Sequence, residues 1–436
     1  MKKLVPQSIK NIYHLFQAVL ANLIYGFPSK NIKVIGVTGT NGKTTTVQMI
    51  TKILEESEKK VAMASTINFK LGEKEWVNAT KFTTLSSFKV QKFIKEAVKT
   101  GCEYLVLETS SHSLDQFRTW GIKYDTAVIT NITREHLDYH KTMEEYRRAK
   151  LKLFKNARVV VVNLDMEKPQ NFIKFGEENI FGYTMENQKS KIKNQNDNIK
   201  FKIIQAKDIE LGIDYAKYKI SAQGGPAFGW QDTNFRLNLL GKFNIENALA
   251  GTCVGLAYGI SLETIKNALE KIKGVPGRME RVPNDEGIEI IIDYAVTPDS
   301  LEKVYSLISQ SKKENAKIIS VFGSCGERDR GKRPIMGEIV SRYADYIILT
   351  NEDPYGEDPE QIIGEVESGI KKHELGKNYW IIMDRREAIK KALQIAKPGD
   401  IFVITGKGAE EVMAIGEKRI PWNEKKVIQE VLQELV

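Results

Sequence analysis

The segment Gly36-Val-Thr-Gly-Thr-Asn-Gly-Lys-Thr-Thr45 places a glycine-rich turn and a lysine between an apolar run and a segment with helical spacing. The preceding residues 32–37 are apolar and rich in β-branched side chains, which predicts a buried strand. Apolar residues recur at helical intervals over residues 45–54, which predicts a helix. A strand, a glycine-rich loop and a helix in this order are typical of a site that binds the phosphates of a nucleotide, because the backbone can wrap closely around them.

The lysine and the threonine that follow the glycines suit ATP. The ammonium of Lys43 would neutralise the β- and γ-phosphates, and the hydroxyl of Thr44 would reach a magnesium ion. The usual pattern has a further glycine where Val37 stands, so this loop is a variant with a glycine inside it. The predicted ATP-binding loop comprises Gly39, Thr40, Asn41, Gly42, Lys43, Thr44 and Thr45.

The composition is that of an ordinary enzyme. The 436 residues are enough for two to three domains with their own cores. The formal net charge of +9 is not gathered in a basic tail, so we expect a polyanionic small substrate and no nucleic-acid partner. Cys102, Cys253 and Cys325 have neither metal-ligand spacing nor an even number for a disulfide framework, which favours a reducing compartment and a cytoplasmic location.

Residues 1–30 contain no acidic residue and hold an apolar run over positions 12–25. The run is short for a membrane span and is interrupted by His14, Gln17 and Asn22. We therefore expect a short apolar helix that packs on the body of the protein. A helix that lies in a membrane interface is the main alternative, followed by a signal peptide or a span, so a peripheral membrane contact stays open.

Apolar β-rich runs alternate with helical patterns along the rest of the chain, which predicts parallel sheets with crossover helices. The Gly-Val-Pro-Gly run at 274–277 separates two such alternations and is the predicted hinge. The expected fold is α/β, with the helix over 1–30, a central P-loop ATPase-like domain with a mainly parallel sheet over 31–274, and a Rossmann-like α/β domain over 275–436. The polar tract 186–200 is expected to be an exposed loop or hairpin tip. The predicted strands are 104–107, 126–129, 159–162, 288–292, 316–322, 346–349 and 401–404, and the predicted helices include 87–99 and 143–154.

Charged and polar residues follow two of the predicted strands, at the points where the strands end. Glu108 follows the first, and His136 and His140 follow the next. Because the ligands of open α/β sheets collect at the carboxyl ends of strands, Glu108 could reach the metal held by Thr44, and His136 offers an imidazole ligand. Three of the five histidines lie within residues 112–140, which favours a site with two cations over isolated surface histidines.

Eight short runs match, in order along the chain, the motifs of one protein family. They are residues 38–45, 108–114 with Arg118, 130–140, 146–154, 240–247, 275–280, 293–299 and 321–334. On these runs the chain resembles the Mur ligases, the ATP-dependent amide-forming ligases of peptidoglycan precursor synthesis, and within that family it is most similar to the MurE type. An ordered set of this kind is far more specific than any single motif.

The resemblance implies a reaction and roles for five residues. Mur ligases phosphorylate a substrate carboxylate with ATP, and an amino-acid amine then attacks the acyl phosphate, so neutralising charge is the main catalytic task. By motif position, Lys43 would hold the β- and γ-phosphates, Thr44 and Glu108 would hold one magnesium ion, and His136 would help to bind a second. Lys150 matches the lysine that the family carbamylates, which turns a cation into a carboxylate-like metal ligand. The alternative for Lys150 is a solvated helix lysine.

The resemblance also implies further contacts with ATP and the other substrates. Asn244 and Asn247 match the asparagines on the adenine side, where an amide pair can donate and accept at a base edge. Arg278 and Asp293 would reach the triphosphate and the ribose from the second domain, so the active site would close as that domain swings in. The implied substrate-binding residues are Thr83, Thr84, Ser110, Ser111, His112, Arg118, Glu352, Asp353, Tyr355, Gly406 and Glu410.

Two departures from the family concern the acceptor and the nucleotide. MurE-type ligases begin with a domain that holds a uridine nucleotide, whereas here the phosphate loop follows a short apolar helix. The resemblance then implies an acceptor held through its sugar and peptide only, or one that is not a uridine nucleotide. The Thr-Thr-Pro run of the family is Thr83-Thr-Leu85 here, and Val296 and Ala409 stand where the family has histidines.

A third departure concerns the amino acid that is added. The Asp-Asn-Pro-Arg run that binds meso-diaminopimelate in many MurE-type ligases corresponds to Glu352-Asp-Pro-Tyr355, so the arginine for the distal carboxylate is replaced by Tyr355. With Glu352, Asp353 and Glu410 adding negative charge, a basic diamino acid such as lysine or ornithine is easier to hold than a second carboxylate.

Two alternatives stay open. One is that Tyr355 only packs, and that Arg385 or Arg386 binds a distal carboxylate. The other is a catalytically silent nucleotide-binding regulator or scaffold of cell-wall synthesis, which the loss of the two family histidines would favour. The complete set of phosphate and metal residues argues against a silent protein and favours an active ligase.

Overall fold

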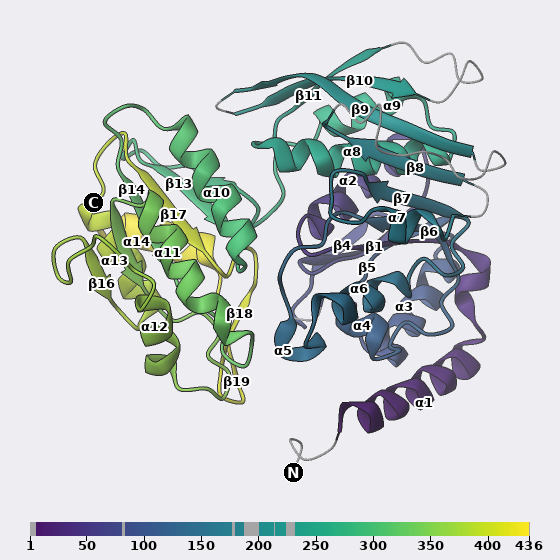
Figure 1. The fold of residues 1–436 in the computed structure, drawn as a ribbon, viewed down its shortest axis with the longest axis horizontal. Helices are drawn as coiled ribbons and strands as arrows, with labels where there is room; N and C mark the ends of the chain where they lie inside the picture. The colour runs from purple at the N-terminus through teal and green to yellow at the C-terminus, as the bar shows by residue number, and fades with distance from the viewer. Residues whose placement is uncertain are drawn as a thin grey trace. The chain divides into compact units, whose positions relative to one another are not determined.

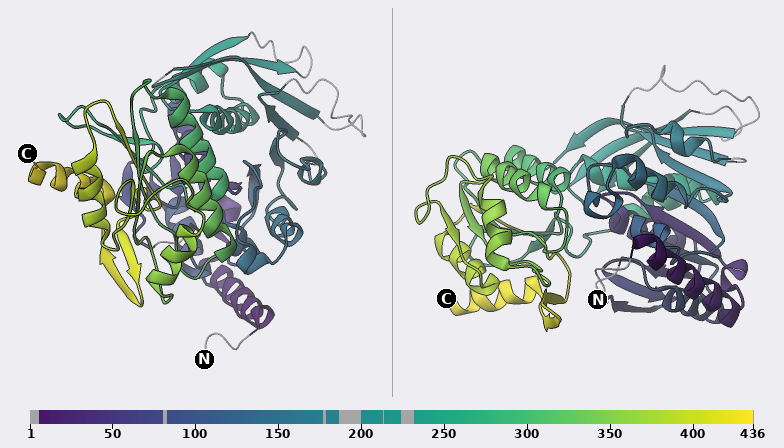
Figure 2. Two further views of the ribbon diagram at one scale, coloured as in Figure 1. Left: turned by 60° about the vertical axis from the view of Figure 1, so that its left-hand side comes forward. Right: turned by 60° about the horizontal axis from the view of Figure 1, so that its bottom comes forward.

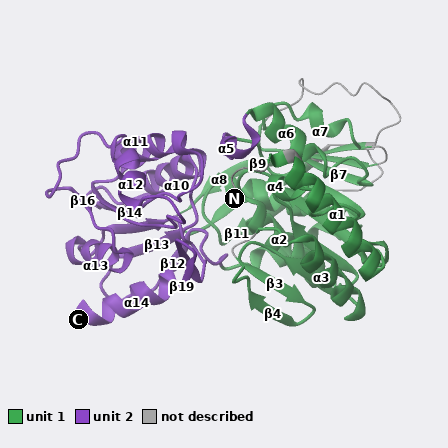
Figure 3. Ribbon diagram, turned by 90° about the horizontal axis from the view of Figure 1, so that it is seen from below, with its two compact units in different colours: residues 1–133, 142–273 green, residues 134–141, 274–436 purple. Residues whose placement is uncertain are grey.

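The computed structural model describes residues 6–80, 83–176, 179–186, 200–212, 214–223 and 232–435, and the chain divides into two compact units (Figure 3). Unit 1 comprises Met1–Thr133 and Thr142–Lys273, and unit 2 comprises Arg134–Lys141 and Gly274–Val436. The segment Arg134–Lys141 therefore belongs with unit 2, although it interrupts unit 1 in the sequence. All but the ends of the polar tract 186–200 lies outside the described residues.

Unit 1 is built on one large sheet with the strand order β11-β10-β9-β8-β7-β6-β1-β5-β2-β3-β4 (Figure 1). Its middle strands are parallel, and antiparallel pairs extend both edges. The middle strands are almost continuously apolar because both faces of a parallel sheet are covered. The strands are β1 (Lys33–Thr38), β2 (Val61–Ala64), β3 (Asn68–Leu71), β4 (Lys74–Val77), β5 (Tyr104–Glu108), β6 (Tyr124–Ile129), β7 (Val159–Asn163), β8 (Asn179–Thr184), β9 (Lys200–Leu211), β10 (Ala216–Gln223) and β11 (Thr233–Leu237).

The helices predicted from the sequence in unit 1 are present, and one of them is shorter than expected. Helix α6 (Met143–Leu151) was expected to run to residue 154, and that expectation is wrong. The backbone tightens after the helix, where Phe154 donates to the Leu151 carbonyl, and this turn carries Leu153 and Phe154 into the core. The other helices are α1 (Gln7–Tyr25), α2 (Lys43–Glu56), α3 (Ser87–Lys99), α4 (Ser111–Asp115), α7 (Gln170–Ile173), α8 (Lys242–Ala257) and α9 (Leu262–Glu270).

Unit 2 contains a second sheet with the strand order β12-β13-β17-β14-β15-β16, and a separate two-stranded hairpin. All of its pairs are parallel except that of β12 with β13. The strands are β12 (Glu280–Val282), β13 (Glu289–Asp293), β14 (Ile318–Phe322), β15 (Tyr346–Leu349), β16 (Tyr379–Ile381) and β17 (Ile401–Thr405), and the hairpin is β18 (Val412–Ile415) with β19 (Lys418–Pro421).

Helices cover both faces of the second sheet (Figure 2). Ile319 and Val321 of β14 pack in one cluster with side chains of α13 and α14. Ser320, between them in the strand, hydrogen-bonds instead with Tyr305 of α10, as alternation of side chains along a strand requires. The helices are α5 (Leu137–His140), α10 (Pro298–Ser311), α11 (Arg333–Tyr343), α12 (Pro359–Glu367), α13 (Arg385–Ile395) and α14 (Glu424–Leu435). The predicted α/β fold is confirmed, with a large, mostly parallel sheet and a second sheet domain.

Candidate active site

The loop between β1 and α2 has a shape that only glycine permits at two positions. Gly39 and Gly42 have φ angles of +155° and +81°. A Cβ atom on Gly39 would lie 1.8 Å from the Thr130 hydroxyl oxygen, and one on Gly42 would lie 2.3 Å from Oδ1 of Asn247. The glycines are therefore required both by the backbone angles and by close neighbours, which is the reason the motif is glycine-rich.

Neighbouring side chains hold this loop in place. The amides of Thr40 and Asn41 donate to the carbonyl and to the side-chain oxygen of Asn131, each at 2.9 Å. The hydroxyls of Thr40 and Tyr146 lie 3.1 Å apart. The Lys43 ammonium donates to the carbonyl of Thr40 at 2.8 Å, so its charge lies over the loop. The loop is thus preformed, with a cation at the position expected for phosphate binding.

Thr44, in the first turn of α2, meets Glu108, the last residue of β5. The Thr44 hydroxyl donates to Oε2 of Glu108 at 3.0 Å, and the Glu108 side chain is buried. Thr66, which the sequence analysis did not identify, donates its amide to Oε2 at 2.8 Å and its hydroxyl to Oε1 at 2.9 Å. The available signal was its place just after β2, because β2 pairs with the strand that ends at Glu108.

A hydroxyl and a carboxylate are suitable ligands for magnesium. In the ranges that the structure describes, no group of three or more histidine, cysteine, aspartate or glutamate side chains could hold a metal ion. Magnesium bound to ATP requires only one or two protein oxygens because phosphates and water complete its octahedron. Thr44 and Glu108 therefore fit a nucleotide-linked magnesium ion.

Lys150 is buried beside the phosphate loop. Only 1% of the residue is exposed, so the alternative of a solvated helix lysine is wrong. Its ammonium donates to the Gly39 carbonyl at 2.8 Å and lies 4.4 Å from the centre of the Tyr146 ring. Burial and, to a smaller extent, the charge of Lys43 hold the pKa of Lys150 well below its ordinary value. A lowered pKa makes the side chain easier to convert to the neutral amine, which is the nucleophilic form.

The two asparagines expected on the adenine side lie at the start of α8. The Asn247 amide donates to Oδ1 of Asn244 at 3.2 Å, and the Thr46 hydroxyl donates to Oδ1 of Asn247 at 3.2 Å. The pair therefore lies directly beside the end of the phosphate loop, against Gly42.

Most of the residues expected to bind the acceptor also come together, near the end of β5. The Thr84 hydroxyl lies 3.3 Å from the Ser110 hydroxyl, and the Arg118 guanidinium donates to the Thr84 carbonyl at 2.8 Å. Thr83 lies 3.2 Å from the hydroxyl of Thr66. Ser111 and His112 form the first turn of α4, which the Ser110 side chain caps. This group of hydroxyls with one arginine adjoins Glu108, because Thr84 donates to the carbonyl of Glu108 at 3.1 Å.

Two of the residues expected to bind the nucleotide lie together in unit 2. Asp293 ends β13, and its Oδ2 accepts from the Met279 amide at 2.8 Å. The Arg278 guanidinium lies 4.4 Å from the centre of the Tyr294 ring. Burial raises the pKa of Asp293, and the charge of Arg278 opposes that rise. An aspartate and an arginine at the end of a strand suit the ribose and phosphate roles that the resemblance implies.

His136 belongs to unit 2, whereas the other expected metal ligands belong to unit 1. It immediately precedes α5 and has a left-handed backbone conformation with φ of +59°. The neighbouring Glu135 pairs with the Lys332 ammonium at 3.0 Å, and Lys332 also donates to the carbonyl of Val296 at 2.8 Å. The role of His136 in binding a second cation stays a prediction.

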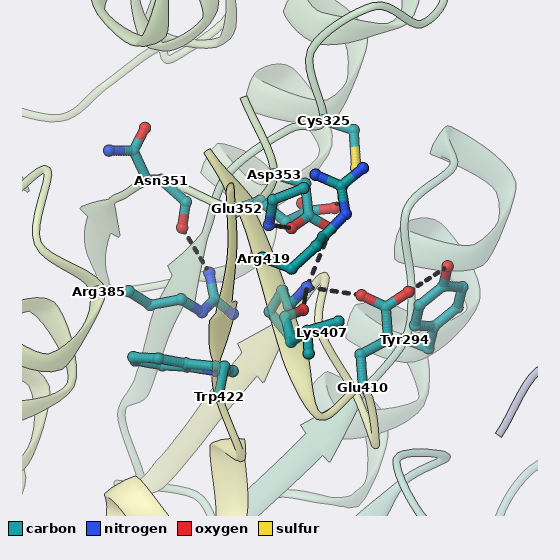
Figure 4. A network of polar contacts seen from close by, with 12 residues as sticks. Tyr294, Cys325, Asn351, Glu352, Asp353, Arg385, Lys407, Glu410, Arg419 and Trp422 are labelled. Carbon is teal, nitrogen blue, oxygen red and sulfur yellow. Dashed lines mark hydrogen bonds and ion pairs between the residues drawn. The ribbon is translucent and has the colours of Figure 1, made fainter. Parts of the chain in front are cut away.

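The charges expected around the amino acid are largely paired within unit 2 (Figure 4). Lys407 is fully buried, and its ammonium donates to Asp353 at 2.9 Å and to Glu410 at 2.6 Å. Asp353 also accepts from the amide of Ala414 at 2.6 Å. Two of the three carboxylates that the sequence suggested for a cationic substrate therefore already face a lysine of the protein.

The third carboxylate, Glu352, is buried against a thiol and a glycine. Its Oε1 accepts from the Cys325 thiol at 2.9 Å, and burial raises its pKa. Gly406 has φ of +109°, and a Cβ atom there would lie 2.6 Å from Oε2 of Glu352. Gly406 thus lets the backbone pass close to this carboxyl group.

Tyr355 is flanked by two arginines. The guanidinium carbons of Arg328 and Arg419 lie 5.4 Å and 5.5 Å from the centre of its ring. Arg328 lies in a matched run and Arg419 lies on β19, but the sequence indicates no contact between them and Tyr355. Cation–π contact of this kind holds a guanidinium in a defined orientation while leaving its N–H groups able to bind an anion.

Arg385 and Arg386, which the sequence suggested as alternative ligands for a distal carboxylate, form ion pairs with glutamates of α14. Arg385 pairs with buried Glu424 at 2.6 Å and donates to the Thr405 carbonyl at 2.8 Å. Arg386 pairs with Glu430 at 3.1 Å and also with Glu434. In this structure both guanidinium groups are thus paired with carboxylates of α14, and a role for either in binding a distal carboxylate stays a prediction.

Comparison with known proteins identifies Mur ligase domains over most of the chain. A model of the Mur ligase middle domain matches residues 37–255, and a model of the Mur ligase glutamate ligase domain matches residues 277–408. A UDP-N-acetylmuramoyl-L-alanyl-D-glutamate--2,6-diaminopimelate ligase of Clostridium tetani is 39% identical over 96% of this chain and 81% of its own. A UDP-N-acetylmuramyl-tripeptide synthetase of a Roseiflexus species is 35% identical over 96% and 82%.

Solved structures agree with these matches. A UDP-N-acetylmuramoyl-L-alanyl-D-glutamate--2,6-diaminopimelate ligase is 32% identical, with a TM-score of 0.59 over 93% of this chain and 79% of that one. A folylpolyglutamate synthase of Mycobacterium tuberculosis complexed with ADP is 15% identical, with a TM-score of 0.70 over 90% and 91% of the two chains, and shares the fold.

Proposed function

Because the chain belongs to the Mur ligase family and is an ATP-dependent acid–amino-acid ligase of the MurE type, we propose that it adds a diamino acid to the carboxylate of a muramyl-peptide-like acceptor through an acyl phosphate. The observation that supports this most directly is the group in unit 1. There a glycine-shaped phosphate loop, the Thr44–Glu108 pair and buried Lys150 lie together.

In the first step, a carboxylate oxygen of the acceptor attacks the γ-phosphorus of ATP. The bond from that phosphorus to the β–γ bridging oxygen breaks, which leaves ADP and an acyl phosphate. Lys43 and the amides at the start of α2 would neutralise the charge on the β- and γ-phosphates during this transfer. Thr44 and Glu108 would hold a magnesium ion, which when bound neutralises further phosphate charge.

The surroundings of Lys150 support carbamylation of this lysine, which would add a second negative charge beside the phosphate loop. Its buried amine has a lowered pKa, and the neutral amine is the form that can react with carbon dioxide to give a carbamate. A carbamate on Lys150 beside the Gly39 carbonyl would offer oxygen ligands for a second cation. The part of His136 in binding a second cation rests on the family resemblance alone.

In the second step, the amine nitrogen of the amino acid attacks the acyl carbon and the carbon–oxygen bond to phosphate breaks. The products are an amide, inorganic phosphate and the proton that the amine releases. Arg118 and the hydroxyls of Thr84 and Ser110 would orient the acceptor, since they gather beside Glu108.

We propose that the added diamino acid carries a carboxylate at its far end, as diaminopimelate does. The expectation of lysine or ornithine assumed that Asp353 and Glu410 were available to a cation, but Lys407 pairs with both. Two guanidinium groups flank Tyr355, which stands where the family motif has its arginine. An arginine matches a carboxylate in a two-pronged geometry, so Arg328 and Arg419 are suited to a distal carboxylate.

Lysine is the second candidate, and one observation favours it. Oε2 of Glu352 has no hydrogen-bond partner in the described part of the chain, so this buried carboxyl group could accept from an ammonium. The raised pKa of Glu352 works against that role, because a neutral carboxyl group attracts a cation only weakly.

The test is ATP-dependent phosphate release with lysine, ornithine and meso-diaminopimelate, each combined with nucleotide-linked and lipid-linked acceptors. We expect release only when acceptor and amino acid are both present, with the highest kcat/KM for meso-diaminopimelate. A preference for lysine would overturn the assignment of the two arginines but not the ligase. No release with any combination would overturn the proposed reaction.

A further inference from the structure

Helix α1 packs on unit 1 through one narrow face. Ala18, Ala21 and Asn22 are fully buried, and the Asn22 amide donates to the Trp120 carbonyl at 2.8 Å. The helix lies against α3 at the edge of unit 1 (Figure 1). The expected packed helix is therefore present, but its contact with the body uses small and polar side chains.

The opposite face of α1 is apolar and exposed. At 100° per residue, the exposed apolar side chains of α1 project within an arc of about 120° around the helix axis, centred opposite Ala18. Ile12 is 68% exposed and Phe16 is 65% exposed, so these side chains bury little area in the protein. The members of this exposed face are Ile9, Ile12, Tyr13, Phe16, Leu20, Leu23 and Ile24. A contiguous stripe of seven exposed apolar side chains on a protein surface marks an interaction site.

The sequence around this helix and the neighbouring α3 are rich in lysine. Residues 1–30 contain Lys2, Lys3, Lys10 and Lys30 and no acidic residue. The neighbouring α3 adds Lys89, Lys92, Lys95 and Lys99 against one acidic residue, Glu96. Lys95 lies 5.8 Å from the centre of the Tyr25 ring, so the lysines of α3 adjoin the end of α1.

We propose that α1 binds the surface of an anionic lipid bilayer. Its exposed apolar face would lie at the boundary between headgroups and acyl chains, and the lysines of α1 and α3 would contact the headgroups. An apolar stripe flanked by lysines has the pattern of helices that lie in a membrane interface. None of the helices in the described ranges is long and apolar enough to cross a membrane. A second copy of the chain is a poorer occupant, because pairing two such faces would bring like charges together.

Vesicle sedimentation of the full chain tests this inference. We expect binding to vesicles of phosphatidylcholine with phosphatidylglycerol, weak binding to phosphatidylcholine alone, and a loss of binding at high salt. Phe16→Glu should lower the partition coefficient about tenfold or more, because it places a charge in the apolar face. Leu375→Glu is the matched control in unit 2, where the leucine is 60% exposed, and it should change binding less than about twofold.

Three outcomes would overturn the proposal. The first is no sedimentation of the wild type with anionic vesicles. The second is equal binding of wild type and Phe16→Glu. The third is a wild-type oligomer in sedimentation velocity that Phe16→Glu converts to a monomer while vesicle binding is absent, which would assign the face to a second copy. Phosphate release by Phe16→Glu in the absence of vesicles should equal that of the wild type, so this test is separate from that of the ligase reaction.

Discussion

The phosphate loop of unit 1 and the Tyr355 region of unit 2 are fixed in different ways. The loop depends on the backbone, because Gly39 and Gly42 combine positive φ angles with neighbours that exclude a Cβ atom. The Tyr355 region depends on pairing, because Lys407 decides how much charge Asp353 and Glu410 can offer to a substrate. A backbone requirement is visible in a sequence as a glycine. The pairing of Lys407 with Asp353, which is 54 positions away, is not visible there, so the charge of Asp353 can be assigned to the wrong partner.

The largest expected effect is on the loop itself. Lys43→Ala and Glu108→Ala should each abolish turnover, because each removes a group that offsets phosphate charge, a loss of several kcal/mol in the transition state. Phosphate release measures this, and thermal unfolding checks that the fold survives. Lys52→Ala is the control, since Lys52 lies on the same helix and pairs with Glu55 on the surface. Near-wild-type release by either active-site variant would refute the proposed site.

The next effect concerns Lys150. Lys150→Ala should be inactive, and short carboxylic acids should restore part of the activity by occupying the place of the carbamate oxygens. Intact-mass measurement should show a carbamylated wild type in bicarbonate buffer. Lys152→Ala is the control, because that lysine lies two positions further on and pairs with Asp115 at 2.8 Å. Full activity of Lys150→Ala, with an unmodified lysine in the wild type, would argue against carbamylation.

The two regions also show how far the sequence could predict the site. The approach of Thr44 to Glu108 was predictable, because Glu108 ends β5, the neighbouring parallel strand β1 reaches the same level at Val37, and Thr44 begins the helix after the loop that follows β1. Thr66 was within reach of the same argument, since it follows the next strand of the sheet. The engagement of Arg385 with Glu424 and the contact of Arg419 with Tyr355 were not predictable, because each joins segments whose approach depends on the packing of α14 and the β18–β19 hairpin.

The fold was predictable for a related reason. Buried parallel strands are apolar throughout, so residues 104–107 and 159–162 stand out as strands without knowledge of their neighbours. The grouping of Arg134–Lys141 with unit 2 was not visible, because it depends on Glu135 meeting Lys332, far away in the sequence. The limits 1–30, 31–274 and 275–436 stay predictions.

A smaller effect would sharpen the assignment of Tyr355 and its arginines. Arg419→Gln should lower kcat/KM for meso-diaminopimelate by about ten- to a hundredfold, because a charge-assisted hydrogen bond contributes about 1.5 to 3 kcal/mol. The value for lysine should change little, since lysine has no distal carboxylate. Arg281→Gln is the control, because Arg281 pairs with Glu289 on the neighbouring strand. An equal loss for both amino acids would mean that Arg419 holds the hairpin and does not select the substrate.

The smallest effect tests pairing in unit 2 away from the substrate. The Arg333 guanidinium, which donates to Glu357 at 2.8 Å, lowers the pKa of Glu357 from 4.5 to about 2. A carboxyl group with a lowered pKa stabilises the fold fully above pH 4.5, and the contribution is lost as the pH falls towards 2. Because solvent screens this partly exposed ion pair, we expect it to contribute about 1 kcal/mol to the free energy of unfolding. We expect the free energy of unfolding to fall less steeply below pH 4.5 in Glu357→Gln than in the wild type. Parallel pH profiles for the two proteins would show that this pair does not stabilise unit 2.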